Sequence, residues 1–164
     1  MHGGSIRVYI ALCESKRKSS SKKINRLIDI EKEDKLFDQK TFLNFYNDLI
    51  IQKEYIKSFF KRKLKNENVY GYGASAKAVT LINFFNLNEQ NVKLIIDDSP
   101  LKQNKYIPGT SIKIYNSKIL LSKPPTYIII LAWNVYKDIL KKIKPFKEIK
   151  YVLIPLPKFK IIKL

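Results

Sequence analysis

Two glycines one residue apart stand where residues 69–77 read VYGYGASAK. A short β-branched and aromatic run leads into them, and the helix-compatible segment AKAVTLINFF follows. Glycine lets a backbone turn tightly and approach a ligand closely, and the start of a helix offers unpaired N–H groups to an anion. Gly71, Gly73 and Ala76 fit the spacing G-x-G-x-x-G/A of a dinucleotide-type phosphate loop. The segment therefore predicts an anion-binding turn between a strand and a helix.

The candidate anion loop consists of six residues, namely Gly71, Gly73, Ala74, Ser75, Ala76 and Lys77. Its backbone N–H groups would contact a phosphate, and the Lys77 ammonium would add a positive charge. The same glycines also suit a tight turn that serves packing alone. The sequence leaves both interpretations open.

An acidic residue follows at a meaningful distance from this loop. Asp97 ends the apolar run VKLII, about twenty residues past the glycines, where a dinucleotide-binding domain places its ribose-binding acid. This spacing supports an NAD(P)- or nucleotide-binding protein of Rossmann type. In the alternative interpretation, the run Asp97-Asp98-Ser99-Pro100 is a turn and a helix cap.

Five further side chains are candidates for the substrate side of a cleft. Lys102, Lys105 and Tyr106 lie in the segment LKQNKYIPGT and would face a nucleotide or a sugar. Trp133 and Asn134 follow a fully apolar run at its carboxyl end, where ligands collect in open α/β sheets. Trp133 would either stack on a base or ring or cover the core.

The elements that must position these residues alternate between strand and helix. We expect strands at 69–71, 92–96, 111–114, 127–131 and 149–154, and helices at 75–85 and 135–143. Alternating elements with fully apolar strands favour a mostly parallel sheet covered by helices on both faces. The fold class predicted is α/β, with a Rossmann-like sheet, flanking helices, and a stray strand and a long linker helix before it.

The N-terminal third of the sequence predicts that strand and that helix. Residues 5–12 are β-rich, and residues 14–23 are Ser/Lys-rich and typical of a mobile loop. An apolar stripe at a helical period follows, with Asp38 or Thr41 as its cap; its members are Phe42, Phe45, Leu49, Ile56, Phe59, Phe60 and Leu64. We interpret the stripe as packing surface. The expected domains are 1–23, a remnant strand and loop; 24–67, a helical linker; and 68–164, the Rossmann-like domain.

Composition narrows the function classes. The 164 residues are 45% hydrophobic, enough for a core, and no apolar run approaches the ~20 residues of a membrane span. The single cysteine, Cys13, excludes an internal disulfide, and no spacing of metal ligands is present. The net charge of +18 comes almost entirely from lysines spread along the sequence, which favours a solvated surface over a specific nucleic-acid face. With no secretory signal visible, we expect a cytoplasmic protein.

Four segments in order identify a family that this sequence resembles. They read GYGASAKAVTLINFF, IIDDSPLKQNKYIPGTSIKI, YIIILAWN and VLIPLP, and MHGGSIRVYI precedes them. Together they resemble the C-terminal domain of the sugar C-methyltransferases, in which the long DDSPLKQNKYIPGT stretch is the most specific part. Members of that family transfer a methyl group from S-adenosylmethionine to a carbon of a nucleotide-linked deoxysugar.

The resemblance implies a substrate-side domain without its catalytic half. The family's cysteine-rich zinc module, its S-adenosylmethionine-binding domain and its Tyr/Glu/His acid–base motif have no counterpart here, so we expect no cofactor in this chain and no activity alone. The resemblance places His2, the weak catalytic candidate, near the substrate. The expected partners are a nucleotide-sugar and either a methyltransferase subunit or a second copy, which would cover the segment 6–10 and the aromatic stripe around Phe42, Phe45, Phe59 and Phe60. A non-catalytic subunit that docks on a separately encoded methyltransferase half stays open as an alternative.

Overall fold

The structure is a computed structural model that describes residues 6–16 and 20–164. The chain divides into two compact units, one at residues 1–50 and one at residues 51–164. Helix α2 (Gln39–Lys63) contributes its first half to the first unit and its second half to the second. Within the described residues, no helix is long and apolar enough to cross a membrane.

The first unit is helical and buries little apolar surface. Helix α1 (Ser21–Glu33) begins inside the segment predicted as a loop and has no buried residue. Lys35, with φ at 55°, separates it from α2, and the backbone N–H of Lys40 donates to Asp38 Oδ1 at 2.9 Å. Of the two caps predicted for this helix start, Asp38 therefore makes the hydrogen bond.

The strand predicted over residues 5–12 is wrong for the residues that the structure describes. Residues 6–12 carry no regular secondary structure and are exposed, and Ser5 lies outside the described residues. A strand exists only when a neighbouring strand accepts and donates its backbone hydrogen bonds. No described segment of this chain pairs with residues 6–12, so these residues form no strand despite their β propensity.

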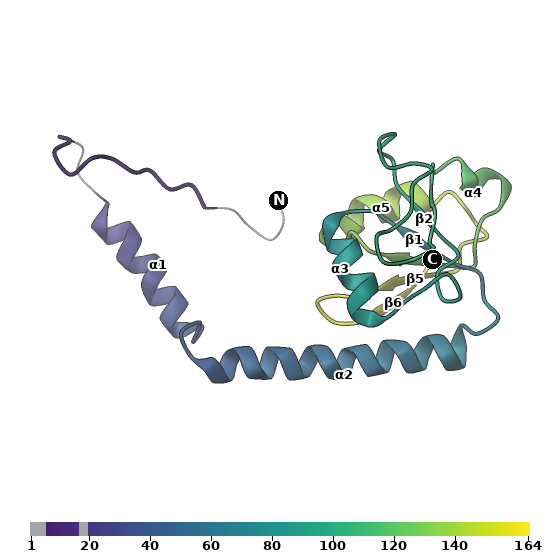
Figure 1. The fold of residues 1–164 in the computed structure, drawn as a ribbon, viewed down its shortest axis with the longest axis horizontal. Helices are drawn as coiled ribbons and strands as arrows, with labels where there is room; N and C mark the ends of the chain where they lie inside the picture. The colour runs from purple at the N-terminus through teal and green to yellow at the C-terminus, as the bar shows by residue number, and fades with distance from the viewer. Residues whose placement is uncertain (1–5, 17–19) are drawn as a thin grey trace. The chain divides into compact units, whose positions relative to one another are not determined.

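The second unit is built on one six-stranded sheet, and the predicted α/β class is confirmed. Its strands are β1 (Val69–Tyr72), β2 (Leu94–Ile96), β3 (Ile114–Tyr115), β4 (Tyr127–Ile130), β5 (Tyr151–Ile154) and β6 (Lys160–Lys163), in the order β3-β2-β1-β4-β5-β6. Figure 1 labels β1, β2, β5 and β6 among them. The first five run parallel and β6 pairs antiparallel with β5. This is the strand order of a Rossmann-type sheet.

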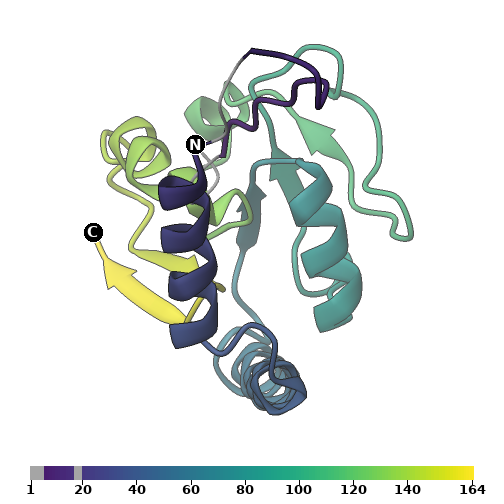
Figure 2. The same cartoon turned by 90° about the vertical axis from the view of Figure 1, so that its left-hand side faces the viewer.

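Helices cover both faces of this sheet. Figure 2 shows α3 (Ala76–Phe85) on one side of the strands and α5 (Tyr136–Ile143) on the other. Side chains alternate along the strands, so Val69 faces the core under α3, while Tyr70 and Tyr72 face the core under α5 and the short α4 (Ile119–Ser122). Because both faces are buried, the strands read as continuous apolar runs.

The second half of α2 is part of this core. Ile56, Phe60 and Leu64 are buried beside α3, which confirms the packing interpretation for that part of the stripe. The Gln52 side chain also bonds the backbone just before β6: its Nε2 donates to the Pro157 carbonyl at 3.2 Å, and its Oε1 accepts the Phe159 N–H at 2.7 Å. The Phe159 ring lies edge-on to Phe59, with the ring centroids 5.3 Å apart.

Several element boundaries differ from the predicted ones. The strand expected at 111–114 is β3 at Ile114–Tyr115, and Lys113 instead forms an isolated antiparallel bridge with Tyr106. Strand β6 and helix α4 were not predicted at all. Ser75 lies just before α3 and caps it rather than beginning it.

Candidate functional site

The carboxyl ends of the parallel strands bring three loops together. The first follows β1 and holds Gly73 to Ser75, the second follows β2 at Asp97, and the third follows β4 and contains the 3-10 helix η1 (Trp133–Val135). Strand β1 lies between β2 and β4 in the sheet. The connection after β1 leads to β2 on one side of it, whereas the later strands β4 and β5 are added on the other side. Ligands of open α/β sheets bind at this point, where the strand order reverses.

The two glycines of the predicted loop are both enclosed by neighbouring atoms. A Cβ on Gly71 would lie 2.7 Å from Ile95 Cγ1 and 2.9 Å from Leu131 Cδ1. Gly73 has φ at +95°, and a Cβ there would lie 2.6 Å from the Ala132 Cβ. The backbone N–H of Gly73 donates to the Ile96 carbonyl at 2.7 Å. Both glycines are therefore required by packing and turn geometry, whatever else the loop does.

At the start of α3, the N–H groups of Gly73, Ala74 and Ala78 already donate to acceptors within the protein. Ser75 is the N-cap of this helix and accepts the Ala78 N–H at 3.3 Å, and no acidic residue lies in the first turn. The Lys77 ammonium lies over the Trp133 ring, 5.4 Å from its centroid. Two side chains singled out from separate motifs of the sequence are thus neighbours, and a cation–π contact holds the lysine near the loop.

Asp97 is committed to the protein's own backbone. It is 8% exposed, and its Oδ2 accepts the Ala74 N–H at 2.7 Å and the Lys102 ammonium at 3.2 Å. Its Oδ1 accepts the Ser99 N–H at 2.9 Å. The carboxylate ties the glycine loop to the loop after β2, as the turn-and-cap interpretation of this segment expects.

Its neighbour Asp98, which sequence reasoning did not select, faces a pocket. The Tyr72 hydroxyl donates to Asp98 Oδ1 at 3.1 Å and lies 3.2 Å from Oδ2, and the Lys142 ammonium donates to Oδ2 at 2.6 Å. Tyr72 ends β1 and Lys142 lies on α5, so three elements contribute. The only signals in the sequence were the position of Tyr72 between the glycines and that of Asp98 beside Asp97.

The electrostatics of this cluster follow from its contacts. Burial acts to raise the pKa of Asp98, but the hydrogen bond and charge of Lys142, with hydrogen bonds from Tyr72 and Ser117, outweigh it, and the pKa lies below its ordinary value. Burial raises the pKa of Tyr72, and the charge and hydrogen bond of Asp98 raise it further. The cluster is thus a carboxylate that accepts from a neutral phenol and an ammonium.

The remaining predicted residues lie at the edge of this region or away from it. Lys102 bonds Asp97, and Tyr106 is exposed in its bridge with Lys113. The backbone carbonyl of Lys105 accepts the Ile114 N–H at 2.8 Å, which ties this segment to β3. Asn134 lies in η1 beside Trp133. His2 lies outside the described residues.

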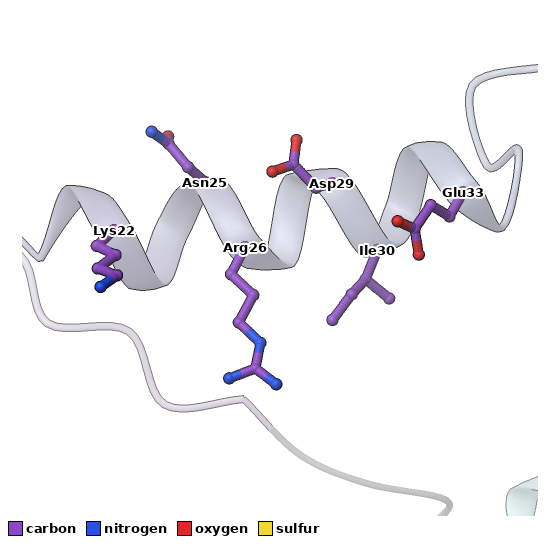
Figure 3. Close-up of a pocket in the computed structure, with 6 residues that line it drawn as sticks. All are labelled: Lys22, Asn25, Arg26, Asp29, Ile30 and Glu33. Carbon is purple, nitrogen blue, oxygen red and sulfur yellow. The ribbon is translucent and has the colours of Figure 1, made fainter.

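A second hollow lies on the first unit, and its lining comes from one helix. Figure 3 shows its six side chains along α1, which are Lys22, Asn25, Arg26, Asp29, Ile30 and Glu33. A single helix face has no opposing wall to enclose a ligand, so we place no site there. Among the described residues, no group of three or more His, Cys, Asp and Glu side chains is placed to hold a metal ion.

Comparison with known proteins adds two findings. The sequence model of the C-methyltransferase C-terminal domain matches residues 1–157. The C-methyltransferase NovU of Streptomyces niveus is 32% identical over 97 residues, which cover 58% of this chain and 23% of that protein. The chain therefore matches about a quarter of the length of this relative.

Proposed function

This chain belongs to the family of C-methyltransferase C-terminal domains, and on that premise we propose that it is the substrate-side domain of a sugar C-methyltransferase. The reaction would move a methyl group from S-adenosylmethionine to a carbon of a nucleotide-linked deoxysugar. In this proposal residues 68–164 form the Rossmann-like domain, residues 24–67 the helical linker, and the methyl donor and the main base come from elsewhere.

The observation that carries the proposal is the junction of the glycine loop with the loop after β4. The N-terminus of α3, capped by Ser75, and the Lys77–Trp133 pair meet there. Backbone N–H groups and an ammonium suit the diphosphate of a nucleotide-sugar, and the indole suits a base or a sugar ring. Lys102, Lys105, Tyr106 and Asn134 would border the same ligand.

Binding measurements test this proposal directly. We expect thermal stabilisation by dTDP, UDP or GDP, weakened at least several-fold in Lys77→Met but not in Lys61→Met, an exposed lysine on α2. Substitution of Gly73 is unsuitable as a test, because its Cβ would collide with Ala132 and disturb the fold. Stabilisation by none of the three nucleotides would contradict the proposal.

Cofactor titration separates this proposal from its alternative. We expect no binding of S-adenosylmethionine and no methyl transfer by this chain alone, and micromolar binding of the cofactor in a calorimeter would overturn that expectation. The strand order and the loop spacing also favour a dinucleotide-binding protein. A clear preference for NAD over the three nucleotides would favour that alternative.

A second element of the proposal concerns the first unit. Phe42, Phe45 and Tyr46 are exposed on α2, and Ile6, Val8 and Ile10 are exposed before α1. We propose that these side chains dock onto the methyltransferase part of the enzyme, since large apolar patches mark interaction sites. Size exclusion with light scattering, on this chain alone and mixed with the methyltransferase part, tests this docking. A chain that is a monomer alone and forms a complex in the mixture supports docking, and loss of the complex in the double variant Phe42→Ser, Phe45→Ser places the contact on α2. A stable homo-oligomer would support self-association instead.

A further inference from the structure

We propose that the pocket around Asp98, Tyr72 and Lys142 binds a sugar ring through a pair of adjacent hydroxyl groups. The inference rests on the proposed nucleotide-sugar substrate and adds a subsite that the glycine loop does not provide. It assigns the polyol contact to Asp98, not to Asp97, the residue that the sequence spacing selects.

The pocket has the size and the walls that a sugar requires. Its volume is about 420 Å³, and it lies between the ends of β1, β2 and β3 and helices α4 and α5. The polar lining is Tyr72, Asp98, Ser117, Lys118 and Lys142. Ligand pockets for small molecules begin at ~300 Å³, so one sugar ring fits.

Asp98 presents a carboxylate that is fixed yet still accessible. Its side chain is 44% exposed, while Tyr72, Lys142 and Ser117 hold it in place. An ionised carboxyl group accepts about four hydrogen bonds over its two oxygens. Tyr72, Lys142 and Ser117 supply three of them, so one sugar hydroxyl donates to the remaining acceptor position and the adjacent hydroxyl accepts from a lysine. Lys142 and Lys118 add N–H donors for the oxygens of the ring.

The apolar wall supports the same ligand. Leu120, Leu121, Ile143 and Phe146 complete the lining, and an aliphatic and aromatic surface suits the C–H face of a ring. Asp98 and Lys142 compensate each other, and Lys118 adds one positive charge beside the oxygens of the ring. A phosphate here would face the Asp98 carboxylate, so phosphate belongs at the glycine loop.

The neighbouring aspartate is unsuited to this role. The Asp97 side chain is 11% exposed, against 44% for Asp98, and its oxygens accept the backbone N–H groups of Ala74 and Ser99. A polyol would have to displace buried bonds that hold the glycine loop, which costs free energy. The pocket and the glycine loop both lie at the carboxyl edge of the sheet, after β1 and β2, and in this proposal one ligand would reach from one to the other.

Four probes test the pocket by nuclear magnetic resonance of the backbone amides. dTDP carries no adjacent ring hydroxyls, UDP carries a ribose pair, dTDP-glucose carries a hexose pair, and free glucose carries no nucleotide. We expect the amides of Ser117, Lys118 and Phe146 to shift with a probe that offers adjacent hydroxyls and not with dTDP. A shift with UDP assigns the pocket to ribose, and one with dTDP-glucose or glucose assigns it to the hexose.

Two variants with a matched control complete the test. Asp98→Asn and Tyr72→Phe should weaken the responsive sugar probe at least tenfold and leave dTDP affinity unchanged. The control is Asp138→Asn on α5, whose carboxylate pairs with Lys141 in solvent. Asp98→Asn with full affinity for the sugar probe would overturn the proposal.

The outcomes separate this inference from the proposed function. If dTDP binds but UDP, dTDP-glucose and tens of millimolar glucose leave the pocket amides unshifted, the sugar subsite is wrong and nucleotide binding stands. If glucose shifts those amides and dTDP does not bind, the subsite stands and the nucleotide proposal fails. If no probe acts, both are wrong.

Discussion

The two halves of helix α2 carry the same kind of apolar pattern, but the aromatic side chains of the first half are exposed, whereas the second half contributes buried side chains to the core. Phe42 and Phe45, in the first half, are 56% and 62% exposed, whereas Ile56 and Phe60, in the second half, are 0% and 3% exposed. One helix thus runs from an exposed apolar surface into the core of a sheet. Amphipathic spacing predicts a helix and an apolar face, but it does not say what covers that face.

The difference lies in what each half contacts within its own compact unit. Residues 56–64 pack beside α3 and over the strands, and Gln52 and Phe59 reach the backbone and ring of Phe159. The first half belongs to the 1–50 unit, in which α1 buries no residue. Isolated helices of this length are marginal in water, so tertiary packing decides their stability.

Hydrogen exchange should reveal the largest contrast. We expect amides of residues 53–63 to open only with global unfolding and those of residues 39–48 to open locally, a difference of about 5 kcal/mol or more in opening free energy. Exchange at several protein concentrations serves as the control for association. Equal protection along the whole helix in a dilute monomer would contradict the comparison.

Truncation of one aromatic side chain in each half of α2 tests the same comparison through the free energy of unfolding. Phe60→Ala should lower the free energy of unfolding by about 3–5 kcal/mol, because it leaves a cavity in the core. Phe45→Ala should change it by less than about 0.5 kcal/mol, since its ring is exposed. Urea unfolding followed by circular dichroism measures both, and a large loss in Phe45→Ala would reveal a partner for the first half.

The left-handed residues of the two units offer a smaller contrast. Gly73→Ala should cost about 2 kcal/mol, because its φ of +95° and the nearby Ala132 Cβ both oppose a side chain. Lys35→Gly, at φ 55° between α1 and α2, should leave the urea midpoint unchanged. A Gly73→Ala variant as stable as the parent protein would show that the loop relaxes away from Ala132.

The smallest effect is on pH dependence. Because the pKa of Asp98 lies below its ordinary value, the folded state binds fewer protons than the unfolded state near that value. Its stabilisation is present above about pH 4 and is lost as the pH falls through the folded pKa. We expect Asp98→Asn to be less stable by about 1 kcal/mol at pH 6, a figure reduced for solvent exposure, with a smaller difference below pH 4.

Asp138→Asn is the matched control for that measurement. Its carboxylate and Lys141 are both mostly exposed, at a distance of 3.5 Å, so solvent screens the pair. We expect no pH-dependent difference between this variant and the parent protein. A difference as large as that of Asp98→Asn would mean that the pocket geometry adds nothing.

Sequence reasoning identified the elements that are buried on both faces and missed those whose existence depends on a partner. The continuous apolar run of β4 and the glycine turn after β1 are local signals, and both lie where they were predicted. Strand β6, with lysines at Lys160 and Lys163, has the mixed pattern of an edge, and only pairing with β5 defines it. The segment 6–12 has the opposite character, strong β propensity without a partner strand among the described residues.

The candidate site divides in the same way. The spacing of Gly71, Gly73 and Lys77 was visible because it lies within one continuous motif. The choice between Asp97 and Asp98 was not, because it depends on which carboxylate the backbone of Ala74 and Ser99 engages. Lys142 lies 44 residues from Asp98 in the chain, so no local pattern pairs them.

The two hydrogen bonds of Gln52 impose an order on folding. They join α2 to Pro157 and Phe159, which lie 105 and 107 residues later in the chain. Contacts between such distant positions form late, because closing the intervening loop costs entropy before any contact compensates it. During synthesis, which runs from the N-terminus, these contacts are absent until residues 157–159 have emerged. Until then Gln52 and Phe59 lack the partners that they have in the folded chain, whereas α3, which packs with Ile56 in the core, has already been made.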